Sequence, residues 1–332
     1  MTIVDIAKEA GYSVSTVSRV LNGRRDVSEE ARDRIMRIVE AYQFVPNNNA
    51  KHLKQTVSQS ILILVKGTSN MLFTNIIEVI QDTIEGSDYS LRVHYLDEDA
   101  DEVKEAVRMC REHKPMGILF LGGNIQYFHE EFELVNVPCV LVTDRADKLG
   151  FRNLSSVSTD DMAAEMAVDY LFDHGHRDIA VIGGDMALSS PSKYRKAGAK
   201  RSFIKHGCEF EEESYAVARF SYESAYNAMN RMLASQRSIT AVFAMSDVMA
   251  VGAMRAIFDA GLRVPEDISV IGFDGTLLAD YYNPKIVTVC QGYEKIARKS
   301  IDLLFGMIDL NKPATHELVP FSLKNTESVS SI

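Results

Sequence analysis

Residues 13–23 read SVSTVSRVLNG, a short stretch that begins with a helix-capping serine and ends at Asn22-Gly23. Apolar residues recur along it at helical spacing, at Val14, Val17, Val20 and Leu21. The intervening positions carry small polar residues and one arginine, namely Ser15, Thr16, Ser18 and Arg19. Such side chains can approach base edges closely, and arginine can bond guanine through two hydrogen bonds. The stretch therefore predicts a helix suited to reading DNA. From spacing alone, a solvated helix face in an ordinary three-helix domain fits equally well.

Two further helices are predicted on either side of this stretch. Thr2 with Asp5 forms a capping pattern, and Gly11 ends the apolar row that consists of Ile3, Ile6, Ala7 and Ala10. Ser28 can cap a third helix, whose apolar stripe is Ala31, Ile35, Ile38, Val39 and Tyr42. Pro46 lies beyond its end. The first part of the chain is therefore expected to be a small unit of three helices.

The chain from Ser58 onward alternates short apolar runs with amphipathic stretches. The apolar runs are Ile61–Val65, Leu91–Tyr95, Gly117–Leu121, Cys139–Val142, Ile179–Ile182, Ala241–Ala244 and Ile268–Gly272, with helices expected at Met162–Phe172 and Val248–Ala260. Such alternation is typical of βαβ units and parallel sheets. The pattern restarts in its second half, which predicts an α/β body of two similar parallel-sheet lobes. A cleft between the lobes, at the carboxyl ends of their strands, is the expected ligand site.

Charge is unevenly divided over the 332 residues, whose net charge is -10. Residues 1–57 carry 9 Lys and Arg against 7 Asp and Glu, so the excess of acid lies in the body, which would keep the body off DNA phosphates. No apolar run approaches the roughly 20 residues of a membrane span, and no signal peptide opens the chain. We expect a cytoplasmic protein without a membrane partner.

Other chemistry has weak support in the sequence. The acidic run Asp97–Glu102 is similar to a calcium loop, but Glu102 stands where glycine is needed and Arg108 where glutamate is needed, so a solvated loop and helix start are predicted. The 4 cysteines have no paired spacing, His174 and His176 have no metal-ligand neighbours, and no G-x-G-x-x-G or G-x-S-x-G motif occurs. We therefore predict no metal site, no cofactor and no catalytic residue.

Several motifs of the sequence resemble those of the LacI/GalR (lactose-repressor/galactose-repressor) family. In the first part, the resemblance rests on Ile3-Val4-Asp5-Ile6-Ala7, Gly11, the stretch from Ser15 to Gly23, Val27-Ser28 and Pro46-Asn47. In the body it rests on Gly175-His176-Arg177, Arg195-Lys196-Ala197-Gly198, Ser246-Asp247, Val264-Pro265-Glu266-Asp267-Ile268-Ser269 and Ile271-Gly272-Phe273-Asp274. The resemblance implies a sequence-specific DNA-binding transcriptional regulator, a repressor, whose operator affinity is modulated by a small-molecule effector, a sugar or sugar derivative, bound between the lobes.

The resemblance also assigns DNA contacts and domain boundaries. It implies a helix-turn-helix domain at 1–46, a hinge helix and linker at 47–59, and an effector-binding and dimerisation domain of two lobes at 60–332. The DNA-binding residues would be Val14, Ser15, Thr16, Ser18, Arg19 and Asn22 in the major groove, with Asn47, Lys51 and Leu53 in the hinge. Leu53 would open a base step from the minor groove. Lys51 stands where the family usually has arginine.

The family's effector positions map onto Phe73, Arg195, Phe220, Ser246, Asp247 and Asp274, and Asp160 is expected in the network around the site rather than in direct contact. Arginine and aspartate suit the hydroxyls of a polyol, and the two phenylalanines suit a sugar's apolar face. Double-stranded operator DNA, a carbohydrate and a second copy of the chain are the expected partners. Two alternatives stay open: a family regulator controlled mainly by a protein partner, and an α/β enzyme with a DNA-binding head.

Overall fold

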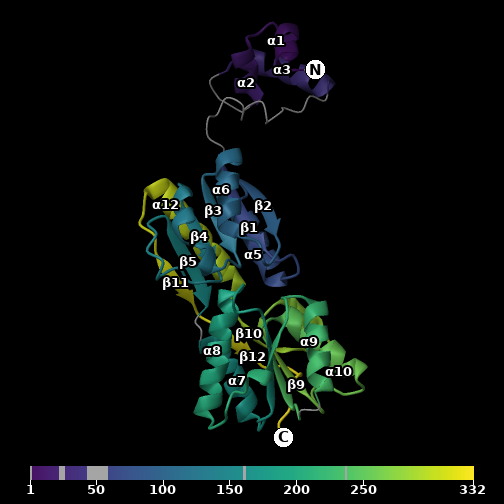
Figure 1. Ribbon diagram of the computed structural model, residues 1–332. Coiled ribbons are helices and arrows are strands. Elements are labelled where there is room, and N and C mark those ends of the chain that lie inside the picture. The colour runs from purple at the N-terminus through teal and green to yellow at the C-terminus, as the bar shows by residue number, and fades with distance from the viewer. Residues whose placement is uncertain (1, 22–26, 43–58, 160–161, 236–237) are drawn as a thin grey trace. The chain divides into compact units, whose positions relative to one another are not determined.

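The computed structural model describes residues 2–21, 27–42, 59–159, 162–235 and 238–332 (Figure 1). The chain divides into two units, Met1–Ser58 and Gln59–Ile332. The hinge expected at 47–59 lies outside the described residues, apart from Gln59.

The described residues of the first unit form three helices, α1 (Ile3–Ala10), α2 (Val14–Leu21) and α3 (Glu29–Ala41). The capping predictions are confirmed: the Asp5 amide donates to the Thr2 hydroxyl at 3.3 Å, and the Thr2 amide donates to the Asp5 carboxylate at 2.8 Å. Gly11 ends α1 with a φ of 73°, a conformation that costs glycine little. The helices pack on a small core of Ile6, Ala7, Ala10, Val17, Val20 and Ile35.

Two residues of the predicted apolar rows lie outside that core. Val14 is 41% exposed and Tyr42 is 53% exposed. Val14 occupies the first turn of α2, and the Tyr42 hydroxyl donates to Glu9 at 3.2 Å. Helical spacing therefore predicted burial of both side chains wrongly, since each lies at an end of its helix.

The first lobe of the second unit is built on a parallel sheet of six strands, which are β1 (Ser60–Lys66), β2 (Ser90–Leu96), β3 (Gly117–Leu121), β4 (Cys139–Val142), β5 (Leu154–Thr159) and β11 (His316–Val319). Their order is β11-β5-β4-β3-β1-β2. Side chains of β1 alternate between the two faces. Ile61 and Ile63 pack with α5 (Met71–Ile84) and α12 (Tyr293–Leu310), whereas Leu62 packs with α6 (Glu102–His113) and the short helix η2 (Glu130–Leu134). Because helices cover both faces, every residue of β1 is buried.

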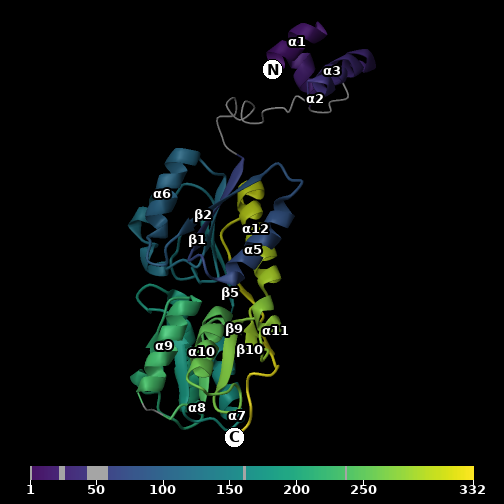
Figure 2. The ribbon, with the colours of Figure 1, turned by 90° about the vertical axis from the view of Figure 1, so that its right-hand side faces the viewer.

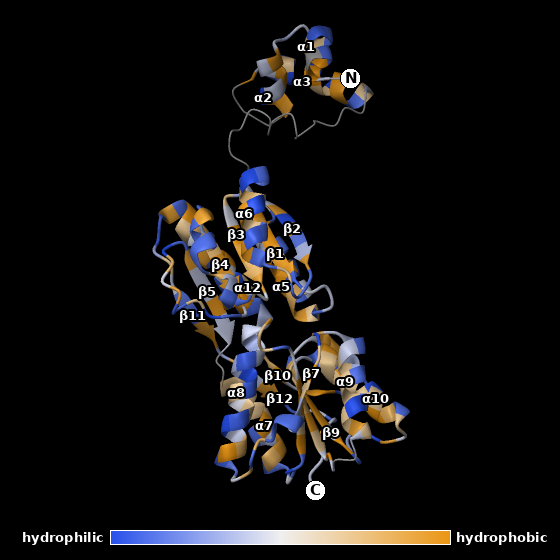
Figure 3. Ribbon diagram, in the orientation of Figure 1, coloured by the Kyte–Doolittle hydropathy of each residue, from blue (hydrophilic) through white to orange (hydrophobic). Residues whose placement is uncertain are grey.

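The second lobe has the same architecture around the strands β6 (Ile179–Gly183), β7 (Tyr215–Val217), β8 (Ala241–Ala244), β9 (Ser269–Asp274), β10 (Val287–Cys290) and β12 (Ser322–Lys324). Their order is β12-β10-β9-β8-β6-β7, and β12 alone pairs antiparallel among these described strands. The helices of this lobe are α7 (Met162–Asp173), α8 (Ser190–Lys205), α9 (Tyr222–Ala234), α10 (Asp247–Asp259) and the short α11 (Leu277–Tyr281). Figure 3 shows hydrophobic residues concentrated on the strands, between the helical layers.

The chain passes between the lobes three times, after β5, after β10 and after β11. As a result α12 returns to the first lobe and lies beside α5, far from it in sequence (Figure 2). The two predicted lobes are therefore confirmed, but each is assembled from separate chain segments. Among the described residues, no helix combines the length and apolar character needed to span a bilayer.

The sequence pattern did not predict strand β5 or the packing of the last residues of the chain. Strand β5 reads LSSVST, and its buried serines bond to neighbours: the Thr315 amide donates to Ser155, and the Ala146 amide donates to Ser156. The last residues, which are rich in serine, are packed as well, since β12 joins the second sheet and Ser328 is fully buried. Satisfied hydroxyls can lie in a core, so serine content alone did not mark solvent exposure.

Candidate functional site

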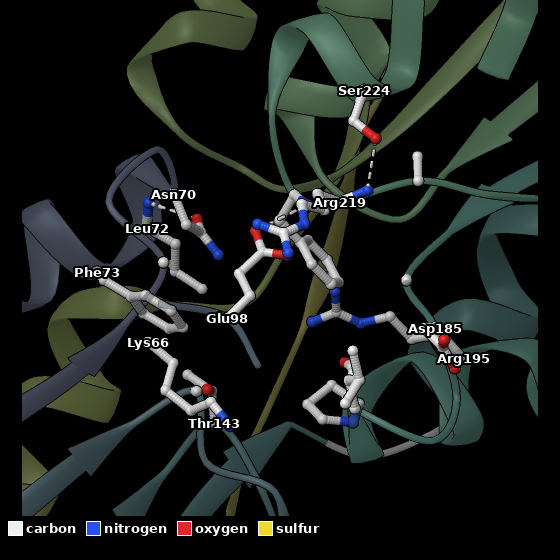
Figure 4. A pocket seen from close by; sticks show the side chains of 18 of the residues that line it. Lys66, Asn70, Leu72, Phe73, Glu98, Thr143, Asp185, Arg195, Arg219 and Ser224 are labelled. Atoms are coloured by element: carbon white, nitrogen blue, oxygen red, sulfur yellow. Dashed lines mark hydrogen bonds between the residues drawn. The ribbon is translucent and has the colours of Figure 1, made fainter. Parts of the chain in front are cut away.

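A cavity of about 280 Å³ lies between the two lobes, at the carboxyl ends of their parallel strands. Figure 4 shows Phe73 and Asn70 entering it from the first lobe and Arg195 from the second. Ligands of open α/β folds bind beyond the carboxyl ends of strands, so the cavity lies where the strand pattern predicted a cleft.

Three glycines that directly follow strands make room for side chains of the cavity. A Cβ atom at each glycine would meet one such side chain: Glu98 at 3.3 Å for Gly67 after β1, Phe73 at 2.7 Å for Gly122 after β3, and Phe220 at 2.8 Å for Gly184 after β6. Distances this short leave no space for a methyl group without movement. The backbone of both lobes is therefore shaped around these three side chains.

Three of the predicted effector residues, Phe73, Arg195 and Phe220, line the cavity. Asp160 lies outside the described residues. Ser246, Asp247 and Asp274 are not among the described residues that line this cavity, and their assignment as effector contacts stays a prediction.

Arg195 is buried on α8 and held from several sides. One guanidinium nitrogen donates to the Met245 carbonyl at 2.6 Å, and the guanidinium carbon lies 4.0 Å from the centre of the Phe273 ring. The other terminal nitrogen is 4.0 Å from Asp274. Burial lowers the pKa of Arg195, and the Asp274 carboxylate opposes that shift. Arg195 is thus a fixed donor that points into the cavity (Figure 4).

Asp274 lies close to the Arg195 guanidinium, below the cavity wall. Its side chain is 2% exposed and accepts a hydrogen bond from Nε2 of the Gln291 side chain at 2.6 Å. Its backbone has a φ of 118°, which an L-residue rarely adopts, at the last position of β9. Burial raises the pKa of Asp274, and the Arg195 guanidinium opposes that shift. Asp274 therefore positions Arg195.

Asp247 and Ser246 stabilise the second lobe internally. Asp247 is fully buried and accepts hydrogen bonds from the Thr276 amide at 2.7 Å, the Thr276 hydroxyl at 2.8 Å and the Thr288 hydroxyl at 2.6 Å. Burial raises the pKa of Asp247, against the hydrogen bonds of both threonines. Ser246 caps α10 by accepting from the Met249 amide at 3.1 Å. The acceptor atoms of both side chains thus bond to groups of their own lobe.

The cavity also contains charged residues that the sequence pattern did not single out as a site. Lys66 lines the wall and donates to Glu102 at 2.9 Å, with both side chains almost completely buried. Burial raises the pKa of Glu102, and Lys66 opposes that shift. The helix start predicted at Glu102 is confirmed, because α6 begins there, but its predicted solvation is wrong, because β1 brings Lys66 to the same place and the pair is buried. A lysine at the end of an apolar strand was the available signal.

Hydrogen bonds join the lobes beside the cavity. The Asn124 side chain donates to the Ala187 carbonyl at 3.0 Å, and the Ile125 amide donates to the Ser190 hydroxyl at 3.2 Å. Glu102 accepts a hydrogen bond from the Asn124 amide, so the buried lysine–glutamate pair supports this junction. A polar chain thus runs from the cavity wall to the contact between the lobes.

In the first unit, α2 presents its polar row outward. Val14, Ser15 and Arg19 are exposed, and Thr16 and Ser18 are partly exposed. The Ser13 hydroxyl accepts from the Thr16 amide at 3.1 Å and lies 2.8 Å from the Thr16 hydroxyl, which confirms the predicted cap of α2. The other expected DNA contacts, Asn22, Asn47, Lys51 and Leu53, lie outside the described residues.

The comparisons with known proteins agree with this architecture. Residues 2–47 match bacterial regulatory proteins of the lacI family, and residues 168–329 match a periplasmic binding protein-like domain. The HTH-type transcriptional regulator MalR of Clostridium butyricum is 35% identical over 100% of both chains.

Solved structures share the whole fold. The lac repressor dimer bound to operator and the anti-inducer ONPF has a TM-score of 0.83 at 24% identity, over 100% of this chain and 99% of that one. The complex of the transcriptional regulator CelR with cellobiose has a TM-score of 0.71 at 24% identity, over 99% of each chain. The chain therefore belongs to the lacI family of bacterial regulatory proteins, and it is a DNA-binding regulator of transcription with a helix-turn-helix unit and a two-lobed α/β unit.

Proposed function

We propose that this regulator is a repressor whose affinity for operator DNA changes when a sugar or sugar derivative binds between its lobes. The observation that carries the proposal is the composition of the cavity wall, which sets Phe73 and Phe220 beside a fixed Arg195 and the polar side chains of Asn70 and Glu98. Aromatic faces suit the C–H surface of a sugar, and the polar groups supply donors and acceptors for its hydroxyls.

The relatives support the same chemistry and a dimeric assembly. CelR is described in complex with cellobiose, and the lac repressor as a dimer bound to operator. One short recognition helix reads few base pairs, so a two-fold dimer on a near-palindromic operator supplies the selectivity that α2 alone lacks. Residues 1–46 would form the DNA-binding domain, 47–59 the hinge, and 60–332 the effector-binding and dimerisation domain.

The proposed contacts follow from exposure and position. Val14, Ser15 and Arg19 would meet base edges with Thr16 and Ser18 beside them, and the family resemblance adds Asn22, Asn47, Lys51 and Leu53. Phe73, Arg195 and Phe220 would contact the effector. Arg19→Ala should weaken operator binding by about 1–3 kcal/mol and relax the preference at one base position. Equal weakening on all DNA sequences would instead assign Arg19 to a phosphate.

The test uses the intact protein. An operator is first selected from random DNA, and the protein is then screened by thermal shift against sugars, sugar phosphates and purines. A sugar at 100 times its dissociation constant should stabilise the second unit by about 2.7 kcal/mol and should also change operator affinity. If no small molecule altered operator affinity while a protein partner did, control by that partner would replace this proposal. Turnover of a ligand would favour an enzyme.

A further inference from the structure

Glu98 enters the cavity from the acidic run between β2 and α6, where the sequence predicted a solvated loop. Its carboxylate accepts a hydrogen bond from the Phe220 amide of the second lobe at 3.1 Å. Gly67 leaves the space that its side chain occupies, in the same way that Gly122 does for Phe73. Glu98 therefore lies in the cavity and contacts both lobes.

The neighbouring residues repeat this contact across the lobes. Asp99, which follows Glu98, lies 3.6 Å from Arg219, which precedes Phe220. Glu98 and Arg219 both line the cavity, and Figure 4 shows them beside one another. Two consecutive residues of the first lobe thus meet two consecutive residues of the second at the wall of the cavity.

Carboxylates outnumber basic side chains among the described residues around the cavity. Each basic side chain of the wall already faces a carboxylate: Lys66 faces Glu102 at 2.9 Å, Arg195 faces Asp274 at 4.0 Å, and Arg219 faces Asp99 at 3.6 Å. Glu98 and Asp185 add two further carboxylates to the wall. Burial raises the pKa of Glu98, against the effect of Arg219 and Lys66. A second anion close to Glu98 would be repelled in this partly desolvated site.

We infer that Glu98 binds the effector by accepting hydrogen bonds from the hydroxyls of an uncharged sugar, and that it excludes sugars bearing a carboxylate or phosphate. The inference rests on the proposed function, whose ligand class it narrows. A carboxylate accepts hydrogen bonds and donates none, so it matches hydroxyl donors. Because Glu98 is also bonded to the Phe220 amide, a sugar on Glu98 stabilises the contact between the lobes.

The test is calorimetric titration of the full-length protein with sugars that share a skeleton and differ in charge. The probes are glucose with glucuronate and glucose 6-phosphate, galactose with galacturonate, ribose with ribose 5-phosphate, and the neutral disaccharides cellobiose and maltose. A neutral sugar should bind, and its charged counterpart should bind at least about tenfold more weakly.

Two variants separate charge from hydrogen bonding. Glu98→Gln keeps an acceptor oxygen for the Phe220 amide and removes the charge. The ratio of the affinity for a neutral sugar to that for its charged counterpart should therefore fall by about tenfold. Glu98→Ala should weaken the binding of the neutral sugar by about tenfold or more. Asp97→Asn is the matched control, because Asp97 is exposed in the same acidic run and lies outside the cavity wall. Its affinities should equal those of the unaltered protein.

The outcomes are distinct. A charged sugar that binds more tightly than its neutral counterpart would overturn the inference and leave the proposed function standing. If both Glu98 variants kept the affinity for neutral sugars and the preference over charged sugars, the inference would also be overturned and the proposed function would stand. Binding of no sugar at all, neutral or charged, would overturn the proposed function. If Glu98→Ala unfolds, as judged by its thermal midpoint, the folded Glu98→Gln protein decides the question.

Discussion

At the scale of single residues, Asp144 lies buried just after β4, beside the junction of the lobes. One carboxylate oxygen accepts from the Arg145 amide at 2.7 Å, and the other has no hydrogen-bond partner among the described residues. Burial raises the pKa of Asp144 to about 7, with the Arg145 amide and Arg195 opposing the shift and Glu102 adding to it. The folded protein therefore holds this proton up to near-neutral pH.

This shift predicts a pH-dependent gain in the Asp144→Asn variant. Between pH 3.8 and about 7 the unfolded chain releases the proton while the folded protein keeps it, so the stability of the unaltered protein falls as pH rises and then levels off. Asp144→Asn removes this penalty. Urea denaturation should show the variant equal to the unaltered protein near pH 4 and about 1–3 kcal/mol more stable at pH 8. Asp147→Asn, exposed in the same loop, should show no such trend, and a gain independent of pH would refute the explanation.

At the scale of elements, the segment after β12 is hydrogen-bonded to strands of the second sheet. The Ser328 hydroxyl donates to the Val270 carbonyl at 2.5 Å and accepts from the Val287 amide at 2.8 Å. A ring nitrogen of buried His176 lies 3.0 Å from the Ser330 carbonyl oxygen. The segment thus satisfies buried polar groups that the strands leave open.

Ser328→Ala should lower the free energy of unfolding of the second unit by about 1–3 kcal/mol, because it leaves a buried amide and a buried carbonyl without partners. Urea denaturation followed by far-UV circular dichroism measures the change. Ser331→Ala removes the same hydroxyl at an exposed position and should be nearly neutral. Equal effects of the two substitutions would mean that the buried hydrogen bonds contribute nothing specific.

At the scale of the whole molecule, three chain crossings join the lobes and the cavity takes residues from both. A ligand that touches Phe73 and Arg195 can favour one relation of the lobes only through contacts that are better made in that state. Because the proposed hinge precedes β1 of the first lobe, such a shift would alter operator affinity by about 1–3 kcal/mol.

Asp274→Ala should abolish this response and spare operator binding in the absence of sugar. The substitution removes the carboxylate that faces Arg195 beneath the cavity, whereas α2 belongs to the other unit. Operator affinity is measured with and without a sugar that shifts the unaltered protein. Asp259→Ala, at the exposed end of α10, is the control and should respond normally. If Asp274→Ala responded at the same sugar concentration, the effector would have to bind elsewhere.

Local patterns were sufficient for the helices of the first unit and for most of the buried strands. Capping by Thr2 and Ser28 depends on residues three positions apart, and apolar runs such as Ile61–Val65 mark strands covered on both faces. The restart of the strand pattern at Ile179 predicted the second lobe. These features involve neighbours in sequence, so a single chain displays them.

The sequence by itself determined the three-helix unit, the two α/β lobes and the position of a cleft at their strand ends. Only the tertiary structure decided which acidic residues face that cleft. Glu98 lines it because Phe220, 122 positions away, offers its amide there, whereas Asp247 is buried because Thr276 and Thr288 occupy its oxygens. Whether a carboxylate meets ligand or core depends on partners that arrive from distant segments, since burial and hydrogen bonding are properties of the assembled lobes.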